Sequence, residues 1–503
     1  MVDTALIGWS RAQFALTACY HWLFVPLTLG LAVIMAVMET VYVVKKDDFW
    51  KRTARFWQKI FGINFAVGIA TGIILEFEFG TNWSNYSWFV GDIFGAPLAI
   101  EGIFAFFMEA TFVAVMFFGW NKVGKKFHLA STWLTGIGAS ISALWILVAN
   151  SWMQHPVGME FNPDTVRHEM VDFWAVVTNP VAITKFFHSV LSGWMTGAVV
   201  VIGLSCWYLL RKRDVRFARA SIKVASIVGI IGTLAVMFTG DGSALHVAKY
   251  QPMKLAAAEG LQDGGQRAPF SIVPGVEIPG MLSVLATHDI DGYVPGINDL
   301  LNGYETPDGV TGISAGEKMA RGDKALEAFS TYRETRDSDP EAAASARKVL
   351  EENVDYFGYG YIDNKEELVP PVWLVYWPFR IMVGLGCFLL LLMVAVFWFE
   401  HRNRIEKMRW LQWLSLCSIP LVYLAGQAGW VVAEVGRQPW AIQDLLPVKA
   451  AVSSLDKGAV MTTFFIFVAV FTLFLAIEIR IMAKAVSKGP EKAPEDSAEQ
   501  ENS

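Results

Sequence analysis

The chain has 503 residues, of which 54% are hydrophobic even before its 42 glycines are counted, and only 17% are charged. A water-soluble protein of this size cannot bury that much apolar surface, so the composition predicts an integral membrane protein. A formal net charge of −6 excludes a nucleic-acid-binding protein. The four cysteines are scattered without CxxC or CxxCH spacing, which argues against a disulfide framework, a zinc site and covalently attached haem.

Nine apolar segments reach the length of about 20 residues that a helix needs to cross a bilayer. They are predicted over residues 13–44, 60–79, 93–120, 129–152, 182–210, 220–240, 372–400, 410–434 and 459–484. The first eleven residues have no cationic lead and no small-residue cleavage site, so we expect the first segment to be a retained helix rather than a signal peptide.

The loops between these spans alternate in charge. Lys and Arg cluster after spans one, three, five, seven and nine, whereas the loop after span two has none. Because cytoplasmic loops carry the excess of Lys and Arg, we expect the N-terminus outside and the C-terminus in the cytoplasm. The sequence thus divides into spans one to six (1–240), an external segment (241–371), spans seven to nine (372–484) and a disordered cytoplasmic tail (485–503).

The segment 241–371 is the one long hydrophilic insertion. It contains 22 Asp and Glu residues against 11 Lys and Arg, two stretches rich in Gly and Pro, and a charged, helix-like run from Ser314 to Asn353. This pattern predicts an external, partly ordered domain. We find no tandem repeat.

Four ionisable side chains well inside the predicted spans are candidates for function. His21 and His188 could each be a hydrogen-bonded core residue or a ligand of a metal or haem. Glu101 and Glu109 lie eight residues apart in span three, so an ideal helix brings them to within about 80° of one face. A proton path and a pair of structural carboxyls are both compatible with this spacing. Ionisable groups at this depth are costly enough to count as functional candidates.

Three further candidates lie at the ends of spans. Glu434 closes span eight, and Arg380 and Met382 open span seven. A guanidinium near a helix entrance calls for an anionic partner such as a haem propionate. With His21 and His188, these residues gather on the outer side, and a trail of carboxylates leads inward. This layout indicates an enzyme that takes electrons from outside and protons from inside.

Five sequence runs together resemble subunit I of the cytochrome bd quinol oxidases, over nearly the whole chain from Arg11 to span nine. The runs are Gly80–Trp83, Gly91–Gly102, Trp152–Gly158, Gln251–Ala256 and Gly436–Trp440. The resemblance implies an all-α membrane protein with nine transmembrane helices, arranged as two four-helix bundles plus one peripheral helix, and a long external quinol-binding loop.

The resemblance also implies a set of haem ligands. His188 and Met382 match the axial ligands of a low-spin b haem, and Arg380 matches the basic residue beside it. His21 and Glu434 match the single ligands of two high-spin haems. Family members exchange which haem occupies each place, so the assignment stays open. The implied cofactors are haem b558, haem b595 and haem d, or a further b haem in place of haem d.

Further roles follow from the resemblance for residues around these haems. Glu101, Glu109 and Ser142 match proton-delivery and haem-pocket positions, and Lys254 and Glu259 match quinol-binding positions. The positions implied to line the haem pockets or bind propionates are Arg11, Arg380, Arg437, Trp430 and Trp440.

The resemblance implies a terminal oxidase of aerobic respiration in the bacterial inner membrane. Such an enzyme oxidises ubiquinol or menaquinol at the outer face and reduces O2 to water with cytoplasmic protons, which generates a proton gradient without a pump. The implied partners are a second large membrane subunit, subunit II, and a small single-span subunit.

Two positions depart from the family pattern. Ser151 stands where the family usually has Gly, and Glu78 stands where it commonly has Gln. Two other functions are weighed against the oxidase: a proton-coupled transporter, which the absence of an inverted repeat disfavours, and a haem-bearing assembly or sensor subunit without turnover.

Overall fold

The computed structural model describes residues 4–491. Within these residues, nine helical segments are long and apolar enough to cross a membrane, which confirms the predicted number and the all-α class. They span Thr4–Lys45, Asp48–Thr81, Ser84–Phe118, Lys125–Trp152, Phe173–Leu210, Val215–Tyr250, Lys365–His401, Arg409–Val435 and Lys457–Lys488. The predicted tail beyond residue 491 lies outside the described residues.

Long helices and short connecting helices alternate along the chain. The α-helices are α1 (Thr4–Lys45), α2 (Asp48–Thr81), α3 (Ser84–Ile100), α4 (Phe107–Phe118), α5 (Lys125–Trp152), α6 (Phe173–Val177), α7 (Pro180–Leu210), α8 (Val215–Tyr250), α9 (Pro252–Glu259), α10 (Met281–Thr287), α11 (Ile297–Asn302), α12 (Ala315–Thr335), α13 (Pro340–Asn353), α14 (Val372–His401), α15 (Arg409–Cys417), α16 (Ile419–Val435), α17 (Val448–Ala451) and α18 (Lys457–Lys488). A π-helical turn, η1 (Glu101–Phe106), joins α3 to α4, and three 3₁₀ segments are η2 (Val354–Tyr361), η3 (Lys365–Leu368) and η4 (Ile405–Lys407).

The strands form four antiparallel two-stranded hairpins. They pair β1 (Met159–Asn162) with β2 (Arg167–Met170), β3 (Phe270–Val273) with β4 (Val276–Ile278), β5 (Tyr304–Glu305) with β6 (Thr311–Gly312), and β7 (Trp440–Ile442) with β8 (Leu446–Pro447). The strands are too short for the sequence pattern to have indicated them.

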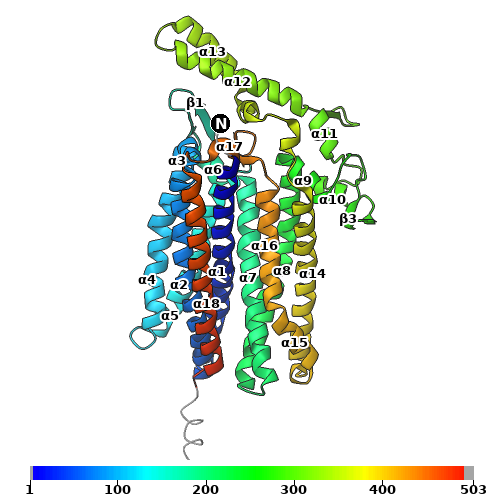
Figure 1. Ribbon diagram of the computed structural model, residues 1–503. Helices are drawn as coiled ribbons and strands as arrows, with labels where there is room; N and C mark the ends of the chain where they lie inside the picture. Colours follow the sequence, from blue (N-terminus) through cyan, green and yellow to red (C-terminus); the bar gives the residue numbers. More distant parts are fainter. Residues whose placement is uncertain (1–3, 492–503) are drawn as a thin grey trace, which may run out of the picture.

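The spans pack as two bundles. α1, α2, α4 and α5 form one bundle, α7, α8, α14 and α16 form the other, and α1 and α5 pack against α7 to join them. α18 packs against α1 and α2 on the outside (Figure 1). This arrangement agrees with the expected two four-helix bundles plus one peripheral helix.

The join between the bundles depends on glycine. α1 and α7 cross so closely that a Cβ on Gly30 would lie 2.7 Å from the Cα of Gly197, and Gly193 lies on the same contact. Next to this crossing, Leu31, Trp57 and Val201 belong to one hydrophobic core, and all three side chains are fully buried. The two bundles are therefore tightly packed against each other at this join.

Helix ends follow local capping chemistry. The Asn179 side chain accepts a hydrogen bond from the backbone of Val181 at 3.0 Å, and Pro180 occupies the first turn of α7. Asp339 and Pro340 begin α13 in the same way. A side-chain oxygen at the N-cap accepts a hydrogen bond from a free backbone N–H of the first turn. A proline at the next position has no N–H that would need a partner.

Span three differs from the single α-helix predicted over 93–120. The helix begins at Ser84, is interrupted at Gly91, where φ is +47°, and continues through η1 before α4 begins. The positive φ is available to glycine at little cost. Glu101 opens η1, whose wider turn changes the angular offset to Glu109 from the value for an ideal α-helix.

Two predicted boundaries are corrected. α8 runs to Tyr250, ten residues past the predicted boundary at 240, because charged residues such as Asp241 and Lys249 lower the hydropathy without ending the helix. α18 runs to Lys488, past the predicted start of the tail at 485, because Ala485 and Val486 are buried and the Val486 carbonyl accepts a hydrogen bond from Tyr208 at 2.6 Å.

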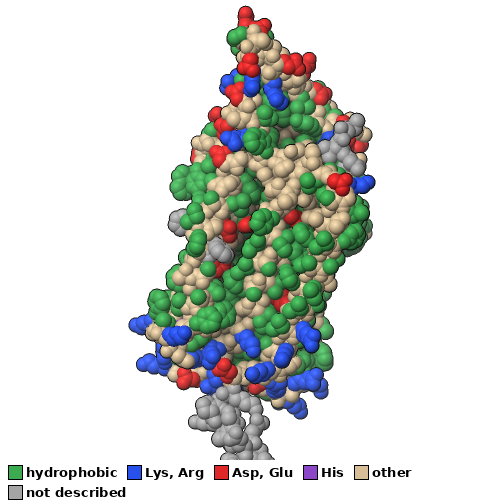
Figure 2. All heavy atoms as spheres, turned by 60° about the vertical axis from the view of Figure 1, so that its left-hand side comes forward, with side chains coloured by type: hydrophobic (Ala, Val, Ile, Leu, Met, Phe, Trp, Pro, Cys, Tyr) green, Lys and Arg blue, Asp and Glu red, His purple; other side chains and the backbone are tan. Residues whose placement is uncertain are grey.

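We call residues 251–371 the cap. The cap holds α9 to α13, lies at one end of the bundle, and carries α12 and α13 farthest from it (Figure 1). The charged run from Ser314 to Asn353 forms these two helices, as its pattern indicated. Figure 2 shows a belt of hydrophobic side chains between the end that bears the cap and an opposite end rich in Lys and Arg.

Candidate functional site

A cavity of about 910 Å³ lies in the half of the bundle nearer the cap. Its lining is mostly apolar, as a site for a large, flat cofactor requires. Nine of the predicted site residues line it: Arg11, His21, Glu101, Glu109, Ser142, Trp430, Glu434, Arg437 and Trp440. Residues from both bundles and from the loop after α16 thus meet around one space.

His21 has one ring nitrogen engaged and one free. Its Nδ1 lies 3.0 Å from the Thr71 hydroxyl, which donates its own proton to the carbonyl of Val67 or Gly68. The hydroxyl must then accept from Nδ1–H, which leaves an unprotonated Nε2. No described residue hydrogen-bonds to this Nε2, so it is available as a metal ligand, oriented in the way typical of ligating histidines.

His188 shows the same arrangement on α7. Its Nδ1 lies 3.1 Å from the Val236 carbonyl, which can only accept, and 3.3 Å from the Thr239 hydroxyl. The proton therefore resides on Nδ1, and Nε2 is free of partners among the described residues. His188 does not line the cavity, so it would serve a separate site.

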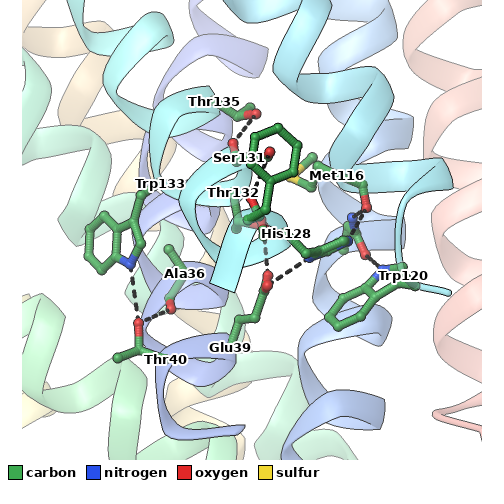
Figure 3. A network of polar contacts seen from close by, with 12 residues as sticks. Ala36, Glu39, Thr40, Met116, Trp120, His128, Ser131, Thr132, Trp133 and Thr135 are labelled. Carbon is green, nitrogen blue, oxygen red and sulfur yellow. Dashed lines mark hydrogen bonds and ion pairs between the residues drawn. The ribbon is translucent and has the colours of Figure 1, made fainter. Parts of the chain in front are cut away.

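His128, which the sequence analysis did not select, differs from His21 and His188 in the state of its ring nitrogens. It is buried at the opposite end of the bundle, with Nδ1 2.7 Å from Glu39 and Nε2 3.0 Å from the Met116 carbonyl. The other Glu39 oxygen accepts from Thr132 at 2.6 Å (Figure 3). Both nitrogens are engaged, so this histidine holds α1, α4 and α5 together and has no lone pair for a metal.

Glu434 is held on both oxygens. Arg437 donates to Oε2 from two nitrogens, at 2.8 and 2.7 Å, and Asn150 donates to Oε1 at 3.2 Å. Asn150 itself accepts hydrogen bonds from Lys185 and from Gln154. The carboxylate is thus fixed at the cavity wall. Asn150 and Lys185 were not among the predicted site residues.

Met382 and Arg380 lie on α14, outside the cavity. The Met382 sulfur lies 3.0 Å from the position that a Cβ on Gly429 would take, so α14 and α16 meet at this thioether. Arg380 forms a buried ion pair with Glu259 at 2.7 Å, and its guanidinium lies 3.7 Å from the centre of the Tyr376 ring. The ion pair joins a residue predicted beside a haem to one predicted to bind quinol.

Lys254 and Glu259 belong to α9, the first helix of the cap, and both are buried. Lys254 donates to Gln154 at 3.0 Å and to Gln251 at 2.7 Å. Burial, together with the charge of Lys185, holds the pKa of Lys254 well below its usual value. Burial raises the pKa of Glu259, and Arg380 opposes that shift.

A continuous hydrogen-bond chain links Lys254 to the cavity. It runs from Lys254 to Gln154, from Gln154 to Asn150 at 3.2 Å, and from Asn150 to Glu434. Gln154 follows Trp152 in one of the runs that carry the family resemblance. The predicted quinol residue and the predicted ligand are therefore connected through side chains of α5 and the residues just after it.

Glu101 and Glu109 both line the cavity, and the Ser142 hydroxyl donates to Glu101 at 2.6 Å. Glu76, two residues before the position that departs from the family pattern, lines the cavity as well. Glu78 does not, since it is buried between α1 and α2, where Thr17 donates to one oxygen and the other has no partner among the described residues. The extra carboxyl is therefore separate from the carboxylates of the cavity.

Comparison with known proteins agrees with the resemblance. The family profile of cytochrome bd terminal oxidase subunit I matches residues 9–490. The chain is 43% identical to cytochrome bd-II ubiquinol oxidase subunit 1 of Escherichia coli (strain K12), over 96% of this chain and 97% of that protein. It is 36% identical to cytochrome bd ubiquinol oxidase subunit 1 of Bacillus subtilis (strain 168), over 96% and 94% of the two chains.

The fold agrees as well. The bd oxidase structure from Geobacillus thermodenitrificans matches with a TM-score of 0.77 at 24% identity, and the match covers 97% of this chain and 100% of that one. The predicted fold and enzyme class are confirmed. This protein is an integral membrane oxidoreductase that belongs to the cytochrome bd terminal oxidase subunit I family.

Proposed function

We propose that the chain is the haem-bearing subunit of a quinol oxidase that takes electrons from quinol at the end that carries the cap and reduces O2 to water. The observation that carries the proposal is the single cavity that brings His21, Glu434 and the carboxyls Glu101 and Glu109 together. Haem, when bound, supplies electron transfer and O2 reduction. The protein binds, orients and insulates it.

The residues present suit haem. His21 and His188 each offer an unprotonated Nε2, and the cavity has a mostly apolar wall with Arg11 and Arg437 beside it. We propose His188 and Met382 as the axial ligands of a low-spin haem b558. His21 and Glu434 would each hold one high-spin haem, b595 or d, or a further b haem. Two protein ligands saturate an iron, whereas one leaves a face open.

The quinol site lies at α9. Lys254 and Glu259 would bind the quinol oxygens, and the Glu259–Arg380 ion pair would place this site beside the low-spin haem. The donor is ubiquinol or menaquinol.

Protons for water formation would arrive from the opposite end through Glu109 and then Glu101, with Ser142 holding Glu101. The Lys and Arg residues at that end support a cytoplasmic location under the positive-inside rule. The N-terminus and the predicted external segment 241–371, which includes the cap, would then face outward. Oxidation outside and proton uptake inside build a proton gradient without pumping.

Hydrophobic side chains cover the membrane belt of the isolated chain. Family membership supports a subunit II partner in the inner membrane, and a small single-span subunit could join the pair. Membership of an oxidase family also argues against the transporter and the sensor without turnover.

The test is a reduced-minus-oxidised spectrum with pyridine haem analysis on the purified complex, together with quinol-driven O2 uptake. We expect three haems per complex and O2 uptake that depends on quinol. A complex without haem would overturn the proposal, as would haem without O2 uptake.

A further inference from the structure

Beside the cavity, at its end near the cap, basic side chains outnumber acidic ones. Arg437, Lys185 and Lys254 are joined to one another through Glu434, Asn150 and Gln154. Glu434 is the one carboxylate in this chain of contacts. Three basic side chains thus share one carboxylate.

Neither lysine has an ion pair within residues 4–491. Lys185 donates to the Asn150 amide oxygen, and its ammonium lies 5.4 Å from the centre of the Trp430 ring. Lys254 donates to two amide oxygens. Amides and an aromatic ring accept hydrogen bonds or attract a cation, but they carry no net negative charge to neutralise one.

Glu434 forms no ion pair with Lys185, and its single charge is shared with Arg437 and Lys254. Both of its oxygens are occupied, one by two nitrogens of Arg437 and the other by Asn150. A charge held away from bulk water without a counter-ion is costly. The arrangement is therefore completed by an anion that the chain itself does not provide.

Lys185 is the better placed of the two lysines to bind that anion. An ammonium has three N–H donors, and Lys185 uses one of them on a side chain, whereas Lys254 uses two. Lys185 is half-buried beside Asn150, Trp430 and Glu434, all of which line the cavity. Its ammonium is thus held by one residue of the cavity wall and lies near the ring of another.

We infer that Lys185 binds a carboxylate of the cofactor in the cavity, namely a propionate of a haem. The inference rests on the proposed function, since it requires haem in this space. Lys185 supplies a charge-assisted hydrogen bond, Asn150 orients its ammonium, and Trp430 lies beneath it. Lys185 is a positioning residue for the cofactor and takes no part in electron transfer.

The experiment replaces Lys185 in the complete purified complex with Met and, separately, with Arg. The control is Lys318→Met in the cap, since Lys318 is also half-buried and lies 5.4 Å from the centre of an aromatic ring, that of Tyr359. The readouts are the haem-to-protein ratio, the rate of haem transfer to an apoprotein acceptor, and the midpoint potential of the high-spin haems.

We expect Lys185→Met to speed haem loss by about tenfold, the effect of removing one charge-assisted hydrogen bond. The midpoint potential should also fall, because a nearby cation favours the reduced haem. Lys185→Arg should stay close to wild type, as should Lys318→Met.

Wild-type haem content, transfer rate and potential in Lys185→Met would overturn the inference alone, as would equal losses in the Met and Arg variants. A wild-type complex without haem would overturn the proposed function as well. A circular dichroism spectrum that matches wild type shows that a loss of haem does not reflect misfolding.

Discussion

At the scale of single residues, a ring nitrogen without a hydrogen-bond partner in the described part of the chain distinguishes the candidate histidine ligands from the structural histidine. His21, His188 and His128 all lie in spanning helices, yet only His128 has both nitrogens engaged by described residues. The first two present Nε2 with the tautomer already fixed. This difference predicts which histidines affect the haems.

Met382→Leu should convert the low-spin haem to high-spin, because leucine fills a similar volume but offers no sulfur ligand. Quinol oxidation should slow, while O2 binding remains. The matched control is Met393→Leu, a fully buried core position on the same helix. An unchanged low-spin spectrum in Met382→Leu would remove this residue as a ligand.

Lys254→Ala and Glu259→Ala should each lower quinol-driven O2 uptake by at least about tenfold, since each removes a charge-assisted contact. Turnover with an artificial donor that reduces the haems directly should stay near wild type. Equal losses with both donors would show that these residues act on the haems or on folding rather than on quinol.

Sequence reasoning selected His21, His188 and Glu434 as candidates because an ionisable group in an apolar span is conspicuous. Met382 became a candidate ligand only through the family resemblance.

Sequence reasoning did not find Lys185 or the Glu39–His128 pair. The partners of these residues come from helices distant in sequence. Lys185 also lies in the second turn of α7, where a lysine is common near a helix end.

At the scale of elements, hydropathy predicted the number and order of the spans but not their shape. It averages over about 20 residues, so the interruption at Gly91 and the π-helical turn at Glu101 were invisible to it. Both lie in the span that carries Glu101 and Glu109. The departures from a regular helix thus occur where side chains are presented to the cavity, as π-helical turns often do at functional sites.

The hairpin β1–β2 should loosen in mild acid. His168 on β2 is 3% exposed, packs edge-on against Phe89, and has no partner for Nδ1 among the described residues. Burial lowers the pKa of His168 to about 4 from 6.5. The unfolded form therefore binds the proton first as the pH falls, so the hairpin loses stability below about pH 6.5, by about 3 kcal/mol once the pH reaches 4.

Hydrogen-exchange protection factors of residues 159–170 at pH 7 and pH 5, each corrected for the intrinsic exchange rate at that pH, measure this effect. His168→Phe should abolish the difference between them. His288→Phe is the control, since His288 is exposed in the cap. Equal protection factors at both pH values in the wild-type protein would contradict the assignment of His168 as a buried neutral group.

At the scale of the whole molecule, the two halves of the membrane domain differ in packing and in polar content. The half away from the cap is a packed core around Trp57 and Val201, and the half beneath the cap holds the cavity, the charged chain from Lys254 to Glu434, and the carboxyls Glu101 and Glu109. Quinol oxidation at the cap and proton uptake from the opposite end would therefore be separated by the length of the bundle.

The most direct test of this account is a cryo-electron microscopy map of the purified complex. The account predicts iron porphyrins within bonding distance of His21 Nε2 and of the Glu434 carboxylate in one shared cavity, and a third between His188 and Met382. A cavity filled by lipid or side chains, or irons held by other residues, would contradict it.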